Sequence, residues 1–424
     1  MLKLPNTTRL LLHCVQLSVT DNMRDEIEAL VRQPIDWKAF EDAAMWHGIA
    51  PLAFNGLRNV QARQHLPAQL FESLKSEYRK NLIRNTMIFA ELEKIVAMLG
   101  EQHVPVILLK GAAITRIIYK DIGLRPMSDI DILVKKEDLY QAVHAIEACG
   151  YHQHDRENLE QLLNTKYHVV YIHPDINVLL EIHWDITSDH NPSLVRSNVP
   201  NLMDMWWSRA SNAESGFNNV FHLHPIDLIC LLSSHFFKHR FVKSGAGFST
   251  HGGILQLCDI LNIVCFYNNE VTWDALAAEA RRIGLTRTVN VALHVVKTLF
   301  ADAIDDRIAF FDNLIIEPSD KAIAHRVVKR IDDMPDKHAP VPIGFIRADK
   351  TASYPDRIAN IVRAAFPDPV TLSGRLNRPI NSNWFYLNYL LRVFLLINNY
   401  GKTWFMRRHL KEEGVLRRWI DGTD

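Results

Sequence analysis

Apolar residues recur at steps of three and four positions through the first quarter of the chain, which is the pattern of amphipathic helices. The pattern is clear over residues 36–57, where Asp36 is placed to cap the first turn. It continues over residues 70–102 with few helix breakers, until Gly100. Residues 22–100 are therefore predicted to be helical.

The pattern changes at Val104, where short apolar runs begin to alternate with amphipathic segments. The predicted order is strand 104–109, helix 112–121, strand 129–134, helix 136–151 and a hairpin over 166–186. Gly150 is placed to close the second helix, and Pro174, Asp175 and Asn177 supply the turn of the hairpin. This order predicts a compact α/β unit built on a mixed sheet.

After about residue 190 the chain is predicted to become helical again, whereas residues 331–382 are rich in Pro, Asp and Lys and are predicted to be irregular. The later helices are expected at 224–241, 252–267, 272–285 and 287–301. The fold class is therefore α+β, with four parts: an N-terminal helical region (1–100), an α/β core (101–190), a helical domain (191–330), and an irregular segment with C-terminal helices (331–424).

The amino-acid composition excludes few functions, but it bears on the binding partners and on the cellular compartment. Lys+Arg and Asp+Glu both number 48, so no overall charge points to nucleic acid or to an anionic membrane. The five cysteines form no CxxC pair, which favours a reducing, cytoplasmic compartment. The N-terminus lacks a signal-peptide pattern, and the apolar stretch 384–400 carries Arg392 at its centre, so a buried helix is favoured there over a membrane span.

The stretch "DIDILV" places Asp129 and Asp131 two positions apart in a run that is otherwise built for burial. Side chains two apart on a strand share a face, so both carboxylates should lie together while Ile130 and Ile132 enter the core. Two buried like charges repel, and a divalent cation such as Mg²⁺ removes that cost. The alternative is an exposed edge strand with both aspartates in solvent.

Two neighbouring segments add to this pair. Lys110 and Gly111 follow the strand at 104–109 and precede a helix, a place where a lysine and an open backbone suit phosphate. Glu181 lies in the second strand of the hairpin, where it could supply a third carboxylate to a metal site. Strand alternation places His183 on the same side as Glu181 and Trp184 on the other.

The combined pattern "LLKGAAI…IYKD…LRPMSDIDILV…LLEIHW…SHFFKH" resembles the DNA polymerase beta-like nucleotidyltransferase superfamily. Within it, the chain resembles the largely uncharacterised bacterial family in which Lys-Gly stands where most relatives have Gly-Ser. The resemblance covers about residues 25–300 and is strongest over 104–184. It implies a nucleotidyltransferase core in the α/β unit.

The resemblance also implies roles for individual residues. Asp129, Asp131 and Glu181 would be the catalytic, metal-binding carboxylates, and Glu181 could help to deprotonate an acceptor hydroxyl. The nucleotide would meet Lys110, Gly111, Arg125, Ser128, His235 and Lys238. For Arg125 a surface turn remains an alternative, and for "SHFFKH" the alternatives are a packing seam in which Asp259 pairs with Lys238 or a histidine, or a zinc site using His235 and His239.

The expected activity is a Mg²⁺-dependent (or Mn²⁺-dependent) transfer of NMP from an NTP, with ATP the expected donor, to a hydroxyl or phosphate, releasing pyrophosphate. The acceptor would be a small molecule, a sugar or a protein, because neutral net charge and the lack of a recognised RNA module disfavour nucleic acid. A non-catalytic nucleotide-binding or regulatory module that keeps the fold is the alternative.

Overall fold

A seven-stranded mixed sheet organises the described part of the chain. The computed structural model describes residues 4–17, 20–154, 157–175, 178–186, 201–213, 216–241, 253–301, 310–314, 316–329 and 389. The strands are β1 (Val106–Leu108), β2 (Asp129–Leu133), β3 (His152–Gln153), β4 (His168–Ile172), β5 (Leu179–His183), β6 (Ser211–Asn212) and β7 (Val220–His222). Their order in the sheet is β3-β4-β5-β2-β1-β7-β6. The mixed α/β fold predicted from the sequence is confirmed.

The hairpin and its neighbour take the places that hydrophobic alternation requires. β4 and β5 pair antiparallel, as predicted for residues 166–186, and β5 lies parallel to β2. Ile130 and Ile132 of β2 are fully buried, as are Leu180 and Ile182 of β5. Because these apolar side chains fill one face, the alternate residues of both strands share the other face.

The segment after residue 190 is not wholly helical, and the prediction is wrong on this point. β7 pairs parallel with β1, and β6 pairs antiparallel with β7, so both strands extend the sheet beyond the predicted core. Val220 is buried beside Val106 in this pairing. A strand of only three residues carries too little alternation to be told apart from a loop in the sequence.

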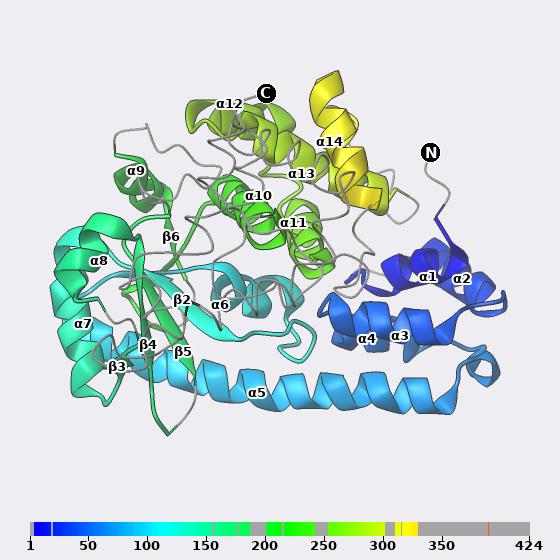
Figure 1. The fold of residues 1–424 in the computed structure, drawn as a ribbon, viewed down its shortest axis with the longest axis horizontal. Coiled ribbons are helices and arrows are strands. Elements are labelled where there is room, and N and C mark those ends of the chain that lie inside the picture. The colour runs from blue at the N-terminus through cyan, green and yellow to red at the C-terminus, as the bar shows by residue number, and fades with distance from the viewer. Residues whose placement is uncertain are drawn as a thin grey trace. The chain divides into compact units, whose positions relative to one another are not determined.

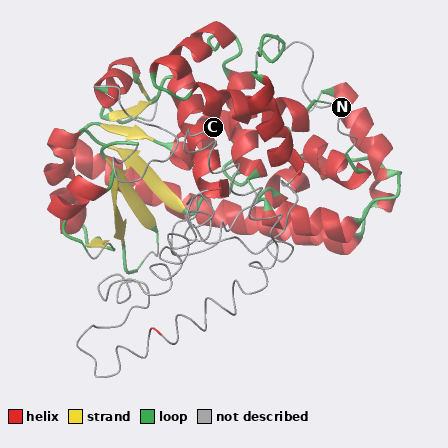
Figure 2. Cartoon of the chain, turned by 45° about the horizontal axis from the view of Figure 1, so that its top comes forward, coloured by secondary structure: helices red, strands yellow, loops and turns green. Residues whose placement is uncertain are grey.

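Helices precede and follow the sheet strands (Figure 1, Figure 2). Those before the first strand are α1 (Asn6–Cys14), α2 (Asp21–Val31), α3 (Trp37–Trp46), α4 (Ala50–Leu57), η1 (Arg63–His65) and α5 (Ala68–Glu101). Those between strands are α6 (Lys110–Ile114), η2 (Thr115–Tyr119), η3 (Lys136–Asp138), α7 (Leu139–Ala148), α8 (Leu159–Thr165) and α9 (Leu202–Arg209). The later ones are α10 (Pro225–Phe241), α11 (Ile254–Phe266), α12 (Trp273–Arg282), α13 (Thr286–Leu299) and α14 (Pro318–Lys329).

The long helix α5 connects the N-terminal helices to the sheet. It contacts α4 at one end and α7 and β2 at the other, and Figure 1 shows it running beneath both groups. Ile88, Leu92 and Leu99 form its buried stripe, each at most 4% exposed. The C-terminal half of the helix therefore packs apolar side chains against its neighbours.

The helix predicted at 112–121 begins and ends elsewhere. α6 begins at Lys110 itself and is followed by the π-helical turn η2, which ends before Lys120. Lys110 and Lys120 both have positive φ, at 46° and 61°. Left-handed backbone is unfavourable for a side chain larger than glycine, so the surrounding structure must hold both residues in place.

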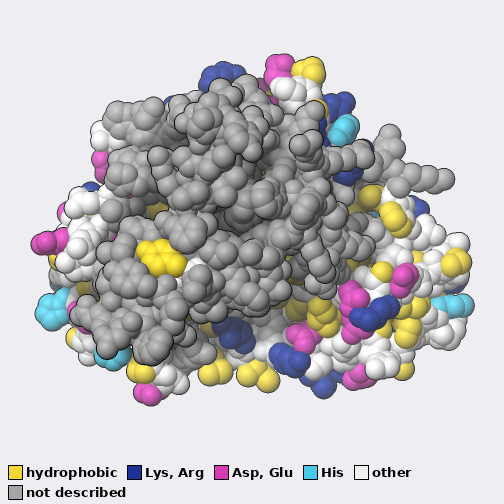
Figure 3. All heavy atoms as spheres, in the orientation of Figure 1, with side chains coloured by type: hydrophobic (Ala, Val, Ile, Leu, Met, Phe, Trp, Pro, Cys, Tyr) yellow, Lys and Arg dark blue, Asp and Glu magenta, His cyan; other side chains and the backbone are white. Residues whose placement is uncertain are grey.

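The chain divides into two compact units, one of Met1–Phe237 with His251–Ile331 and one of Lys238–Thr250 with Asp332–Asp424. The stretches 331–382 and 384–400 lie outside the described residues, except for Tyr389. Among the helices of the described residues, none combines the length and the apolar character needed to cross a membrane. On the face drawn in Figure 3, basic and acidic side chains are interspersed over the described surface, in keeping with their equal numbers.

Candidate active site

Strand register brings together two of the three predicted carboxylates, Asp131 and Glu181. In the parallel pairing of β2 with β5, Asp131 stands opposite Glu181, and Leu133 stands opposite His183. Asp131 is 3% exposed, whereas Asp129 is partly exposed at the start of the strand. The hairpin lies beside "DIDILV", so that Asp131 and Glu181, 50 positions apart in the sequence, become lateral neighbours.

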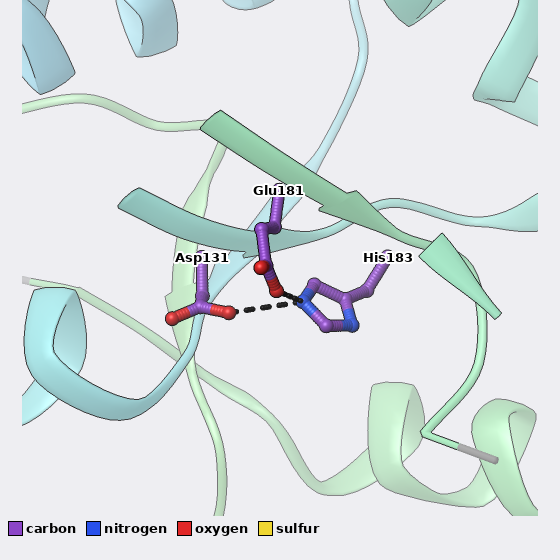
Figure 4. Close-up of side chains that lie close together, drawn as sticks. All are labelled: Asp131, Glu181 and His183. Carbon is purple, nitrogen blue, oxygen red and sulfur yellow. Dashed lines mark hydrogen bonds and ion pairs between the residues drawn. The ribbon is translucent and has the colours of Figure 1, made fainter. Parts of the chain in front are cut away.

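His183 joins this pair and was not among the predicted site residues. Its Nε2 lies 3.0 Å from Asp131 Oδ1 and 3.2 Å from Glu181 Oε2, so both carboxylates converge on one imidazole nitrogen (Figure 4). The His168 ring stacks against the His183 ring at a centroid distance of 5.0 Å. The alternation that placed His183 on the side of Glu181 was the sequence signal for this contact.

Lys110 supplies the positive charge of the site. Its Nζ lies 2.5 Å from Asp131 Oδ1 and 3.7 Å from Glu181 Oε2, and its side chain is 15% exposed. The sequence predicted that this lysine would meet phosphate; the structure places its ammonium on the carboxylates. Burial disfavours the charged ammonium, but Asp131 and Glu181 outweigh that effect and raise the pKa of Lys110 above its usual value.

The carboxylates differ in their electrostatic surroundings. Burial, followed by repulsion from Asp131, raises the pKa of Asp129 from 3.8 to about 6, although a hydrogen bond from the Ser128 hydroxyl at 3.1 Å opposes the rise. Burial alone would also raise the pKa of Glu181. The hydrogen bond with His183 and the charge of Lys110 outweigh burial and hold the pKa of Glu181 well below its usual range. Glu181 is therefore ionised at neutral pH.

Arg125 and Gly111 pack against each other at the edge of this group. A Cβ on Gly111 would lie 2.6 Å from Arg125 Nη1, so glycine is the residue that allows the guanidinium to lie here. The guanidinium forms two hydrogen bonds to Asp259 on α11, at 3.0 Å and 2.7 Å. Tyr119 also donates to Asp259, at 2.7 Å. Arg125 therefore takes part in a buried ion pair, and its expected contact with phosphate stays a prediction.

The same contacts give Asp259 two partners that the sequence did not suggest. The sequence suggested Lys238 or a histidine as its partner, whereas the structure gives it Arg125 and Tyr119. His235 is half-buried on α10, and the side chain of Lys238 lies outside the described residues. The roles expected of His235 and Lys238 toward the nucleotide therefore remain predictions.

Side chains of helix α5 hold the loop that leads into β2 through hydrogen bonds to the backbone of that loop. Three side chains on one face of the helix donate hydrogen bonds to five carbonyl oxygens of residues 122–128. Asn81 donates to Gly123 (2.7 Å), Arg84 to Met127 and Ser128 (2.9 and 3.1 Å), and Asn85 to Ile122 and Arg125 (2.6 and 2.7 Å). These polar positions, within an otherwise ordinary amphipathic helix, gave no sequence signal of their role.

The donor set suits a divalent cation. Among the described residues, one oxygen each of Asp131 and Glu181 and one ring nitrogen of His183 lie within 4.8 Å of one another. Carboxylate oxygens are the ligands that Mg²⁺ and Mn²⁺ prefer, and an imidazole nitrogen is acceptable to Mn²⁺ and later transition metals. The side chains present therefore fit a metal ion that binds phosphates.

Comparison with known proteins agrees with this geometry. A family model described as an uncharacterised nucleotidyltransferase matches residues 33–301, which include α5, the sheet, Lys110, the carboxylates and Asp259. No curated protein and no solved structure matches the chain. The matched segment is well over half of the 424 residues. The chain therefore belongs to this family of uncharacterised nucleotidyltransferases.

Proposed function

We propose that the chain transfers NMP from an NTP, with ATP the expected donor, to a hydroxyl or phosphate oxygen of an acceptor. The observation that supports this most is the register of β2 and β5, which sets Asp131 beside Glu181 with Lys110 at the same point. Acidic side chains of two strands with one lysine are what phosphoryl chemistry needs, since its catalysis is mostly positioning and charge neutralisation.

The proposed transfer forms one bond and breaks one. An acceptor oxygen bonds to the α-phosphorus of the NTP while the bond from that phosphorus to the bridging oxygen breaks, and pyrophosphate leaves with the electron pair. An acceptor hydroxyl also loses its proton. Glu181 is the partly exposed carboxylate of the pair, and we assign this proton to it. An acceptor phosphate needs no such base.

Asp131 and Glu181 are assigned to hold Mg²⁺ or Mn²⁺, with His183 as a nitrogen donor beside them. Asp129 lies outside that group of three, and its assignment as a third carboxylate rests on the family pattern. When bound, the cation would neutralise charge on the triphosphate and on the leaving pyrophosphate. His183 also fixes the two carboxylates relative to each other through its Nε2. Gly111 keeps the backbone open next to Lys110, and Ser128 orients Asp129.

The acceptor is expected to be a small molecule, a sugar or a protein. His235 and Lys238 are the residues of the later helical region that we assign to the nucleotide or the acceptor, on the strength of the family pattern. Equal numbers of acidic and basic residues disfavour a nucleic acid in this role.

The test is to incubate the protein with each α-labelled NTP and Mg²⁺ or Mn²⁺, with and without cell extract as a source of acceptor. Label transfer with pyrophosphate release supports the proposal, and both should fall by more than about 100-fold in Asp131→Asn. Glu137→Gln, an exposed acidic residue of η3, is the matched control and should retain activity. Nucleotide binding without transfer in every reaction would instead favour the non-catalytic module.

A further inference from the structure

Lys110 is held in an unusual position by several independent features. Its φ of 46° lies in the left-handed region, which is unfavourable for a residue that carries a side chain. The preceding residue, Leu109, donates its backbone N–H to the carbonyl of Asp131 at 3.0 Å and so anchors the chain to β2. The side chain then lies mostly buried against Asp131 and Glu181.

The contacts of Lys110 and the candidate metal ligands coincide. Its Nζ and the Nε2 of His183 both bond to the same oxygen of Asp131, Oδ1. The second contact of Nζ is Oε2 of Glu181, the oxygen that also faces His183. A divalent cation bound by Asp131 and Glu181 would lie close to the ammonium, which contacts one oxygen of each carboxylate, and two cations that close together repel.

We infer that Lys110 is a tethered cation that competes with the divalent ion for Asp131 and Glu181, and that metal binding releases its ammonium toward the nucleotide phosphates. The second half of this statement rests on the proposed function. A lysine suits such an exchange because its charge is compact and its four-carbon stem can swing between partners. Before metal and nucleotide bind, the lysine keeps the buried carboxylates neutralised.

This competition predicts the direction in which the affinity for metal changes when Lys110 is replaced. If Lys110 neutralises the carboxylates, replacing it with an uncharged residue of similar length removes the competitor, and metal should bind more tightly although a site residue has been lost. Lys110→Met is therefore expected to bind Mn²⁺ at least tenfold more tightly than the wild-type protein in the absence of nucleotide. Lys136→Met, an exposed lysine of η3, is the matched control and should bind Mn²⁺ as the wild type does.

The experiment is a calorimetric or electron paramagnetic resonance titration with Mn²⁺ alone. Unchanged or weaker binding by Lys110→Met would overturn the inference. Tighter binding that disappears in Lys110→Met with Asp131→Asn would place the effect at this site. Label transfer by the wild-type protein together with unchanged Mn²⁺ affinity in Lys110→Met refutes only this inference. Tighter binding without transfer from any NTP refutes only the proposed function.

A second measurement uses the wild-type protein and needs no variant to fold. Brief acetylation followed by mass spectrometry reports how accessible each lysine amine is. Saturating Mg²⁺ should raise the labelling of Lys110 severalfold and leave Lys136 unchanged, because the released ammonium enters solvent. Labelling of Lys110 that stays constant or falls on addition of Mg²⁺ would overturn the release step.

Discussion

The ion pair between Arg125 and Asp259 should stabilise the fold more than any exposed ion pair does. Arg125 is 8% exposed and Asp259 is fully buried, and the two parallel hydrogen bonds of the guanidinium match both carboxylate oxygens. Arg125→Met keeps the bulk of the side chain but leaves the Asp259 carboxylate with the Tyr119 hydroxyl. Removing one partner from a buried pair costs about 3–5 kcal/mol in the free energy of unfolding.

A double-mutant cycle isolates the pair from the rest of its surroundings. Asp259→Asn keeps an acceptor for Tyr119 but strands the guanidinium charge, so a loss of about 3 kcal/mol is expected. In Arg125→Met with Asp259→Asn neither charge is left alone. The double variant should therefore be more stable, by about 2–3 kcal/mol, than the sum of the two single losses implies.

Urea unfolding followed by far-ultraviolet circular dichroism gives the four free energies at pH 7.5. Arg116→Met is the control, because Arg116 pairs with Glu93 at the surface and should cost less than about 1 kcal/mol. Single losses at Arg125 and Asp259 no larger than this control, or strict additivity in the double variant, would refute the reasoning.

Three further predictions concern Gly111, Asn85 and His222. Gly111→Ala should lower the free energy of unfolding by about 1–3 kcal/mol, measured in urea, because the new Cβ meets the Arg125 guanidinium. The loss should be smaller in an Arg125→Met background, and an equal loss in both backgrounds would contradict the packing argument. Asn85→Ala should lower the free energy of unfolding by about 2 kcal/mol, because two hydrogen bonds to loop carbonyls are lost. Thr86→Ala, on the exposed side of α5, is the control and should be nearly neutral. Equal thermal midpoints for the two variants would contradict the role of Asn85 in holding the loop. Burial lowers the pKa of His222 from 6.5 to about 4, so between these values the unfolded chain binds the proton more readily and stability is lost as the pH falls. Compared with His222→Gln, the wild-type protein should lose about 2 kcal/mol more between pH 7.5 and pH 5, and parallel pH profiles would exclude this origin.

The core of the site could be predicted from the sequence because period-two alternation is a local property. Asp129 and Asp131 stand in one strand, and Glu181 and His183 in another, so each pair could be assigned to a strand face from its neighbours alone. That the hairpin lies beside the aspartate strand was expected from the role of Glu181 as a third carboxylate, and the register agrees with it. Alternation could not predict that the carboxylates of Asp131 and Glu181 would both contact His183 and Lys110.

The parts that escaped prediction depend on contacts between distant segments. Asp259 is 134 positions from Arg125, and nothing near either residue identifies the other as its partner. β7 escaped because three residues carry too little pattern, although its pairing with β1 completes the sheet. The starting point of α6 was misplaced because a left-handed lysine at position 110 is unfavourable by itself and is imposed by surrounding structure.

The hydrogen bonds from α5 to the loop before β2 have a consequence for how this family can diverge. Every residue has a backbone carbonyl whatever its side chain. The hydrogen bonds from Asn81, Arg84 and Asn85 therefore do not depend on which side chains the loop carries. A loop position that is not fully buried, such as Ile122, can then change while the path of the chain into Asp129 stays fixed. The constraint falls instead on three residues of a helix more than 40 positions upstream of that aspartate. A comparison of relatives centred on the acidic motif alone would overlook the part of the chain that keeps it in place.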